Sequence, residues 1–233
     1  MVHDATDVGY KHIDTASAYL NEKAVGQAVT EVIAKGVLKR EDLFITTKIM
    51  PVDTDSKAEA LKGVALALEK LNTTYVDLML IHRPSTDAVN SEVWSALEEA
   101  VSEKHIKSIG VSNFQISQID SLLKSAKIIP AMLQVESHPQ QNQDQLIEYC
   151  NKHDIRMTAY SPLGAGTLLK DATIGSIGKS HNKSAASVMI RWQVQRGVVA
   201  IPKSTKRNYL IENIDVFDWS LTDNEMKVLD EMK

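Results

Sequence analysis

The sequence predicts an α/β fold and, within that class, a (β/α)8 TIM barrel. Short runs rich in β-branched and aliphatic residues alternate with longer segments of helical periodicity along the whole chain. Parallel strands need crossovers of about a dozen residues, which the helical segments provide. No Gly-x-Gly-x-x-Gly pattern follows any of the runs, so the main signature of the competing fold, a doubly wound open sheet, is absent.

Seven runs are predicted to be strands, and nearly all of them end in a polar or reactive side chain. The runs cover 10–14, 43–48, 76–82, 106–112, 131–136, 155–160 and 198–203. The residues at their ends are Asp14, Lys48, His82, Ser112 with Asn113, Glu136, Tyr160 and Lys203. Loops are generally polar, but that alone does not specify lysine, histidine and tyrosine after apolar runs. In barrels the carboxyl ends of several strands together carry the chemistry, so this pattern favours the barrel.

The segments between the runs are predicted to be helices with recognisable ends. Ser-x-x-Glu at 56–59 and Thr-x-x-Glu at 222–225 have the pattern of capping boxes at helix starts. Residues 21–35 carry valine and isoleucine on one helical stripe, and Gly36 follows as a C-terminal stop.

The composition predicts one globular domain over residues 1–233, in the cytoplasm. The chain is 43% hydrophobic and 24% charged, and its single cysteine, Cys150, allows no internal disulfide. With 26 basic and 30 acidic residues and no long run of like charge, nucleic acid is not expected as a partner. No apolar run approaches the length of a membrane span and no leader is recognised. His138 and His153 have no partners at metal-ligand spacing, so no metal is predicted.

Asp14, Tyr19, Lys48 and His82 are predicted to form a catalytic set, because neighbouring barrel strands would place them around one pocket. A phenol with a reference pKa of about 10 is a weak acid, and an adjacent ammonium makes it a better one by stabilising the phenolate. A buried ammonium in turn needs a carboxylate partner. A histidine beside them can polarise a substrate oxygen. Such a set is a general acid for a developing alkoxide.

The residues around this set resemble the aldo-keto reductase family, along essentially the whole chain. The matching segments are "GYKHIDTASAYLNE" (9–22), "LFITTK" (43–48), "DLMLIHRP" (77–84), "IGVSNF" (109–114), "LQVESHP" (133–139), "TAYSPLG" (158–164) and "IPKS" (201–204), in the family's order. The resemblance implies an oxidoreductase that reduces small aldehydes or ketones to alcohols with hydride from NADPH, Tyr19 being the general acid. It also suggests a monomer.

The resemblance further implies a set of cofactor-binding residues. Ser112, Asn113 and Gln134 would bind the carboxamide, Tyr160 would stack on the nicotinamide, Ser161 and Leu163 would lie along the pyrophosphate, Lys203 and Ser204 would meet the 2′-phosphate, and Glu212 and Asn213 the adenine. An aromatic face suits a flat ring, and a cation with hydroxyl donors suits a phosphate.

Three departures from the family pattern set further expectations. Tyr209 stands where many members carry an arginine for the 2′-phosphate, which predicts a weakened NADPH preference. Arg83 replaces the family's tryptophan after the strand-end histidine, which changes one wall of the substrate pocket. Only "MVHDATDV" precedes Gly9, so we expect a barrel lacking the N-terminal hairpin and first βα unit. The alternative is therefore a truncated or inactive module of this family with a cofactor-binding or regulatory role, and a barrel with unrelated chemistry is the least favoured interpretation.

Overall fold

The computed structural model describes residues 1–51 and 55–232, which form two compact units. Of the described residues, 2–51 and 55–133 form the N-terminal unit, and 134–232 together with Met1 form the C-terminal unit. Strand β5 (Met132–Glu136) begins in the first unit and ends in the second.

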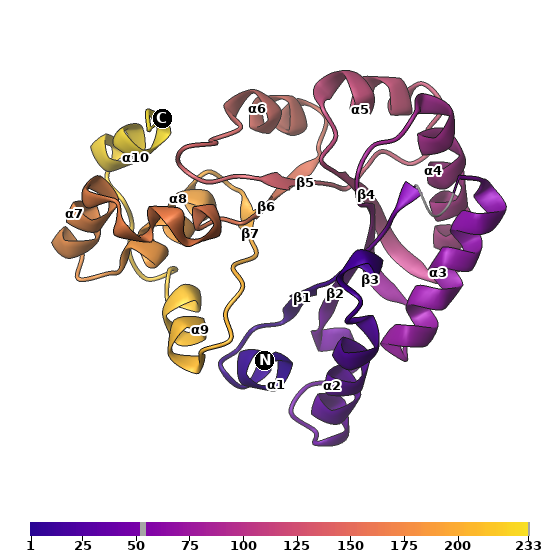
Figure 1. Ribbon diagram of the computed structural model, residues 1–233, viewed down its shortest axis with the longest axis horizontal. Helices are drawn as coiled ribbons and strands as arrows, with labels where there is room; N and C mark the ends of the chain where they lie inside the picture. Colours follow the sequence, from indigo (N-terminus) through magenta and orange to yellow (C-terminus); the bar gives the residue numbers. More distant parts are fainter. Residues whose placement is uncertain (52–54, 233) are drawn as a thin grey trace. The chain divides into compact units, whose positions relative to one another are not determined.

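The N-terminal unit contains a parallel sheet covered by helices. Its strands are β1 (His12–Asp14), β2 (Phe44–Ile49), β3 (Val76–Ile81) and β4 (Ile106–Ser112). Its helices are α1 (Val2–Asp7), α2 (Glu22–Ala34), α3 (Lys57–Leu71), α4 (Asp87–Ser102) and α5 (Ile116–Leu123), with short 3-10 helices at Ser17–Tyr19 and Arg40–Asp42. Helices α2, α3 and α4 lie outside the strands (Figure 1). Strand β1 pairs in parallel with β2, β2 with β3, and β3 with β4.

Burial of the central strand explains why this sheet forms. All six residues of β3 are buried, as expected of a parallel strand covered on both faces. The register pairs Asp14 with Thr46 and Lys48 with Leu80. Helices α2 and α3 approach closely at Gly26, where an added Cβ would lie 2.5 Å from the backbone of Leu71. The carboxyl ends of β1–β3 therefore form one edge on a tightly packed scaffold.

A charged network holds the opposite, amino-terminal end of the strands. Asp77 of β3 is 5% exposed and accepts hydrogen bonds from the Ile45 N–H (3.0 Å), from Arg40 Nη2 (2.9 Å) and from Lys107 Nζ (2.9 Å). Both cations also lie over the Tyr75 ring, at 4.0 Å and 4.3 Å from its centroid. Burial raises the pKa of the Asp77 carboxyl, but these donors together hold that pKa below its ordinary value.

We expect Asp77→Asn to destabilise the protein at pH 7 by about 2–3 kcal/mol, because Arg40 and Lys107 lose their carboxylate. The pKa of Asp77 is depressed in the folded state, so the unfolded chain binds more protons as the pH falls. The stabilisation by Asp77 is complete above the pKa of about 3.9 that the carboxyl has in the unfolded chain. It is lost as the pH falls through the lower pKa of the folded state. Urea unfolding at pH 3 to 7 should show that the difference in unfolding free energy between wild type and variant becomes smaller as the pH falls. The exposed acid Glu69, changed to glutamine, is the control and should keep the wild-type acid profile.

The C-terminal unit continues the strand–helix alternation. It contains the end of β5, β6 (Arg156–Tyr160) and β7 (Val199–Ala200), and the helices α6 (Asp144–Lys152), α7 (Ala172–Ser180), α8 (Ala185–Gln195), α9 (Arg207–Ile214) and α10 (Asp223–Asp230). Strands β6 and β7 are parallel. A hydrophobic cluster joins α7, α8 and α10; its buried members are Leu168, Ile174, Ile177, Val188, Met189, Trp192, Leu221 and Leu229. Cys150 is buried in α6, where burial raises the pKa of its thiol to about 11.

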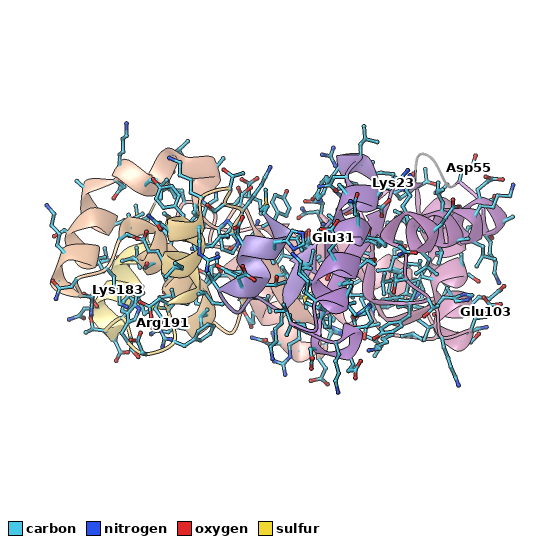
Figure 2. All side chains as sticks on the ribbon, turned by 90° about the horizontal axis from the view of Figure 1, so that it is seen from below. Lys23, Glu31, Asp55, Glu103, Lys183 and Arg191 are labelled. Atoms are coloured by element: carbon cyan, nitrogen blue, oxygen red, sulfur yellow. The ribbon has the colours of Figure 1, made fainter. Side chains whose placement is uncertain are left out.

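Two cations of α8 and its preceding turn fix the segment between α9 and α10. Lys183 Nζ lies 2.9 Å from Asp215 Oδ2, and Arg191 Nη1 donates to the Val216 carbonyl oxygen at 2.8 Å. Both side chains lie at the same end of the unit in Figure 2. This segment leads directly from α9, whose residues matter for the site below.

The predicted elements are found with small differences. Each of the seven predicted runs contains a strand, but the run 198–203 contributes only Val199–Ala200, because Pro202 has no N–H for the ladder. Thr222 forms the predicted capping box, and helix α2 ends just before Gly36, whose φ is +70°. Helix α1 was not predicted. None of the helices within residues 1–51 and 55–232 has the length and apolarity needed to cross a membrane.

Candidate active site

The four predicted catalytic residues lie together at the carboxyl ends of β1–β3 in the N-terminal unit. Lys48 is fully buried, and its Nζ donates to Asp14 Oδ1 at 2.5 Å, to the Thr15 carbonyl oxygen at 3.0 Å and to the Tyr19 hydroxyl oxygen at 3.3 Å. The Tyr19 and His82 rings meet edge to face, with centroids 5.6 Å apart.

The hydrogen bonds of the lysine determine what the tyrosine can do. An ammonium has three N–H donors, and the three contacts of Lys48 use all of them. The phenol oxygen of Tyr19 accepts one, so its own O–H can point elsewhere. Tyr19 is 47% exposed, whereas Lys48 is inaccessible. The arrangement presents an O–H donor to a ligand and places a positive charge behind it, which stabilises a phenolate once the proton has left.

His82 is neutral in this environment. Burial lowers the pKa of its imidazole to about 4, with the charges of Lys48 and Arg83 adding to the effect and Asp14 opposing it. Its Nδ1 is buried and has no hydrogen-bond partner among the described residues. A neutral imidazole retains one N–H, so His82 can donate a single hydrogen bond to a ligand oxygen at pH 7.

The backbone of His82 is held from both sides. Its N–H donates to the Ile49 carbonyl oxygen of β2 at 2.9 Å, and its carbonyl oxygen accepts from Asn113 Nδ2 at 3.0 Å. Asn113 also donates to Ser112 Oγ at 3.1 Å and has a left-handed backbone with φ of 62°. The predicted cofactor residue Asn113 is thus linked directly to the predicted catalytic histidine, and Ser112 is linked to it through Asn113.

Sequence reasoning missed a second contact that fixes the loop carrying Tyr19. Glu22, 2% exposed at the start of α2, accepts a hydrogen bond from Thr47 Oγ1 of β2 at 2.6 Å, and burial raises the pKa of its carboxyl. Thr15 Oγ1 donates to Asn21 Oδ1, also at 2.6 Å. The loop is therefore joined to the strand that carries the buried lysine. The sequence offers only a threonine next to Lys48 and an acid at position 22 as signals of this contact, and an acid in a first helical turn is ordinary.

A cavity of about 570 Å³ in the C-terminal unit is lined by six of the ten predicted cofactor residues. These are Ser161, Leu163, Lys203, Ser204, Glu212 and Asn213. Tyr209 also lines the cavity, and Lys206 Nζ lies 5.3 Å over its ring. Cation, hydroxyl, carboxylate and aromatic groups thus face one space, a combination suited to a phosphorylated nucleoside.

The remaining predicted cofactor residues are not among those lining this cavity. Gln134 is buried in β5, and Tyr160 is half-buried at the end of β6, while Ser112 and Asn113 belong to the N-terminal unit. Within residues 1–51 and 55–232, no cluster of three or more His, Cys, Asp or Glu side chains is arranged to hold a metal ion.

Comparisons with known proteins find similarity along the whole chain. The model of the Aldo/keto reductase family matches residues 1–233. The 9,11-endoperoxide prostaglandin H2 reductase of Trypanosoma cruzi is 44% identical over 98% of this chain and 80% of its own, and the glyoxal reductase of Bacillus subtilis is 43% identical over 95% and 78%.

Solved structures extend the likeness to the fold. An aldo/keto reductase from Brucella melitensis matches all of this chain and 88% of its own with a TM-score of 0.94 and 39% identity. A Bombyx mori aldo-keto reductase in complex with NADP matches 98% of this chain and 80% of its own with a TM-score of 0.93 and 33% identity. The predicted barrel fold is thereby confirmed.

Proposed function

Since this chain belongs to the aldo/keto reductase family, we propose that it reduces an aldehyde or ketone to the alcohol, with Tyr19 as the proton donor. The chain is an oxidoreductase, and the cofactor of its family is NADP(H). The observation that carries the proposal is the fully buried Lys48, which donates to Asp14 and to the Tyr19 hydroxyl oxygen at once.

Each residue of the set has a separate role in the proposed reaction. NADPH, when bound, would supply the hydride that reduces the carbonyl carbon. Neutral His82 donates a hydrogen bond to the carbonyl oxygen and polarises it. Tyr19 transfers its hydroxyl proton to the same oxygen, giving the alcohol, and the Lys48 ammonium stabilises the phenolate that remains. Asp14 keeps the ammonium charged and in place.

We also propose the cofactor contacts that the resemblance to the family implies. The assignments are Ser112, Asn113 and Gln134 to the carboxamide, Tyr160 to the nicotinamide face, Ser161 and Leu163 to the pyrophosphate, Lys203 and Ser204 to the 2′-phosphate, and Glu212 and Asn213 to the adenine. Support comes from the cavity that six of them line and from the hydrogen bonds of Asn113 to Ser112 and His82.

The substrate is proposed to be a small carbonyl compound, in keeping with the name of the glyoxal reductase. A single domain, a monomeric state and a cytoplasmic location stay predictions from the sequence. The second candidate function, a cofactor-binding or regulatory module without turnover, uses the same cavity but gives the buried Lys48–Asp14 pair no chemical role.

One titration separates these functions. NADPH fluorescence is followed as protein is added, and an aldehyde is then supplied while absorbance at 340 nm is recorded. Saturable binding followed by a fall in absorbance is the expected result. Binding without turnover of any aldehyde in a broad panel would favour the module, and a folded chain without NADPH binding would contradict both functions.

We expect NADPH to be preferred over NADH, but by less than an arginine at position 209 would give. Tyr209 lines the cavity beside Lys203 and Ser204 and offers an aromatic face instead of a guanidinium. Tyr209→Arg should raise the ratio of NADH to NADPH dissociation constants by about tenfold, the effect of one added charge-assisted contact. Fluorescence titration with both nucleotides measures this ratio. Tyr209→Phe is the control and should leave it unchanged; equal wild-type affinities for the two nucleotides would refute the expected preference.

A further inference from the structure

The charged side chains at the carboxyl ends of β1–β3 are not all paired. Lys48 is neutralised by Asp14 at 2.5 Å, and His82 is neutral. Glu22 is buried and bonded to Thr47, on the side of the loop away from solvent. The next residue along the chain from His82 is Arg83, an exposed cation. Among the described residues, Arg83 is thus a cation beside the proposed catalytic residues with which no acidic side chain pairs.

The guanidinium of Arg83 has no partner in the described protein. No hydrogen bond or ion pair joins its side chain to any part of residues 1–51 or 55–232. Asp55, an exposed acid in the segment after β2, forms no ion pair with it and lies at the outer edge of the unit in Figure 2. Other surface cations of this unit, such as Lys57 and Lys62, are paired with glutamates at 2.7 Å and 2.6 Å.

The position of Arg83 is restricted although its side chain is free. The preceding His82 is fixed through its N–H and its carbonyl oxygen, and the following residue is Pro84, whose ring limits the backbone. The guanidinium lies close enough to His82 for its charge to lower the pKa of that imidazole. An unpaired arginine is therefore held beside the histidine that is proposed to bind the substrate oxygen.

We infer that Arg83 binds a carboxylate of the substrate, so that the preferred substrates are carbonyl compounds that also carry a carboxylate group. The inference rests on the proposed function and specifies its substrate class. A guanidinium matches a carboxylate with two parallel N–H donors. The contact forms equally in the ground state and the transition state, so it should act mainly on KM.

The test compares the 2-, 3- and 4-formylbenzoates with their methyl esters, which have the same aldehyde without the charge. For at least one isomer, kcat/KM for the carboxylate should exceed that for the ester by about tenfold, mostly through KM. Arg83→Met should reduce this ratio to about one, and Arg83→Lys should restore part of it because a lysine supplies charge without the fork. Lys124→Met, which removes an exposed cation at the end of α5, should keep the wild-type ratio.

The outcomes separate this inference from the proposed function. Wild type that reduces esters as well as carboxylates would overturn the role of Arg83 and leave carbonyl reduction intact. An equal fall of the ratio in Lys124→Met would overturn it too, because the preference for carboxylates would then come from the positive charge of the surface in general and not from Arg83. A strong preference for a phosphorylated aldehyde over every carboxylate would reject the carboxylate class. Calorimetric binding of the matching alcohols, as acid and as methyl ester, reads the same contact without turnover, so failure of the reaction alone would count only against the proposed function.

Discussion

Tyr19→Phe is expected to lower kcat for aldehyde reduction by about a thousandfold while NADPH binding persists. The change keeps the ring that meets His82 edge to face at 5.6 Å. It removes the hydroxyl oxygen that lies 3.3 Å from Lys48 Nζ and with it the proposed proton donor. Because the proton moves only during the reaction, the loss should appear in kcat and not in the NADPH dissociation constant. Both are obtained from fluorescence titration and from the absorbance at 340 nm.

Tyr75→Phe is the matched control, because it removes a hydroxyl at the other end of β3 and keeps the ring between Arg40 and Lys107. It should reduce aldehydes at the wild-type rate. If Tyr19→Phe did so as well, Tyr19 would not be the general acid and the proposed mechanism would be wrong.

The strand-end residues could be predicted because periodicity alone locates strand ends. Asp14 and Lys48 are the last or next-to-last residues of their strands, and His82 follows directly after β3. Parallel register then brings neighbouring ends to one edge. Tyr19 required one more step, since it lies in a loop whose path is not periodic.

Contacts made by ordinary residue types could not be predicted in the same way. Glu22 in a first helical turn is usually solvated and interacts with the helix dipole. Its burial against Thr47 depends on how α2 packs against β2, which no local sequence pattern indicates. The same holds for Asp77, whose two cations come from segments 37 positions before it and 30 positions after it. Such pairings depend on tertiary structure.

The cavity proposed to bind the nucleotide shows what local sequence patterns cannot indicate. Lys203 and Tyr160 stood out as polar ends of apolar runs, but Glu212 and Asn213 lie on α9, where nothing in their local pattern marks a ligand. Only the resemblance to the family singled them out, and the cavity that both residues line supports the assignment. Arg83 shows the converse, because its place after the strand-end histidine is plain in the sequence, but only the structure shows that its side chain has no partner among the described residues.

Lys48→Met is expected to affect both catalysis and stability. Asp14 would keep a carboxylate in a site where its side chain is 10% exposed, without the ammonium now 2.5 Å away. Removing one partner of such a buried pair costs about 3–5 kcal/mol of unfolding free energy. The phenolate of Tyr19 would also lose its stabilising charge, so kcat should fall by about two to three orders of magnitude. Urea unfolding and single-turnover reduction measure the two effects separately.

The double variant Asp14→Asn with Lys48→Met separates the two losses. It removes the Asp14 carboxylate, which Lys48→Met alone leaves without its ammonium. Much of the lost unfolding free energy should therefore return, because replacing both partners of a buried ion pair is tolerated far better than replacing one. Activity should stay low, since the ammonium behind Tyr19 is still missing. Recovery of turnover together with stability would mean that Lys48 serves only the fold, and the proposed acid would then have to work without it.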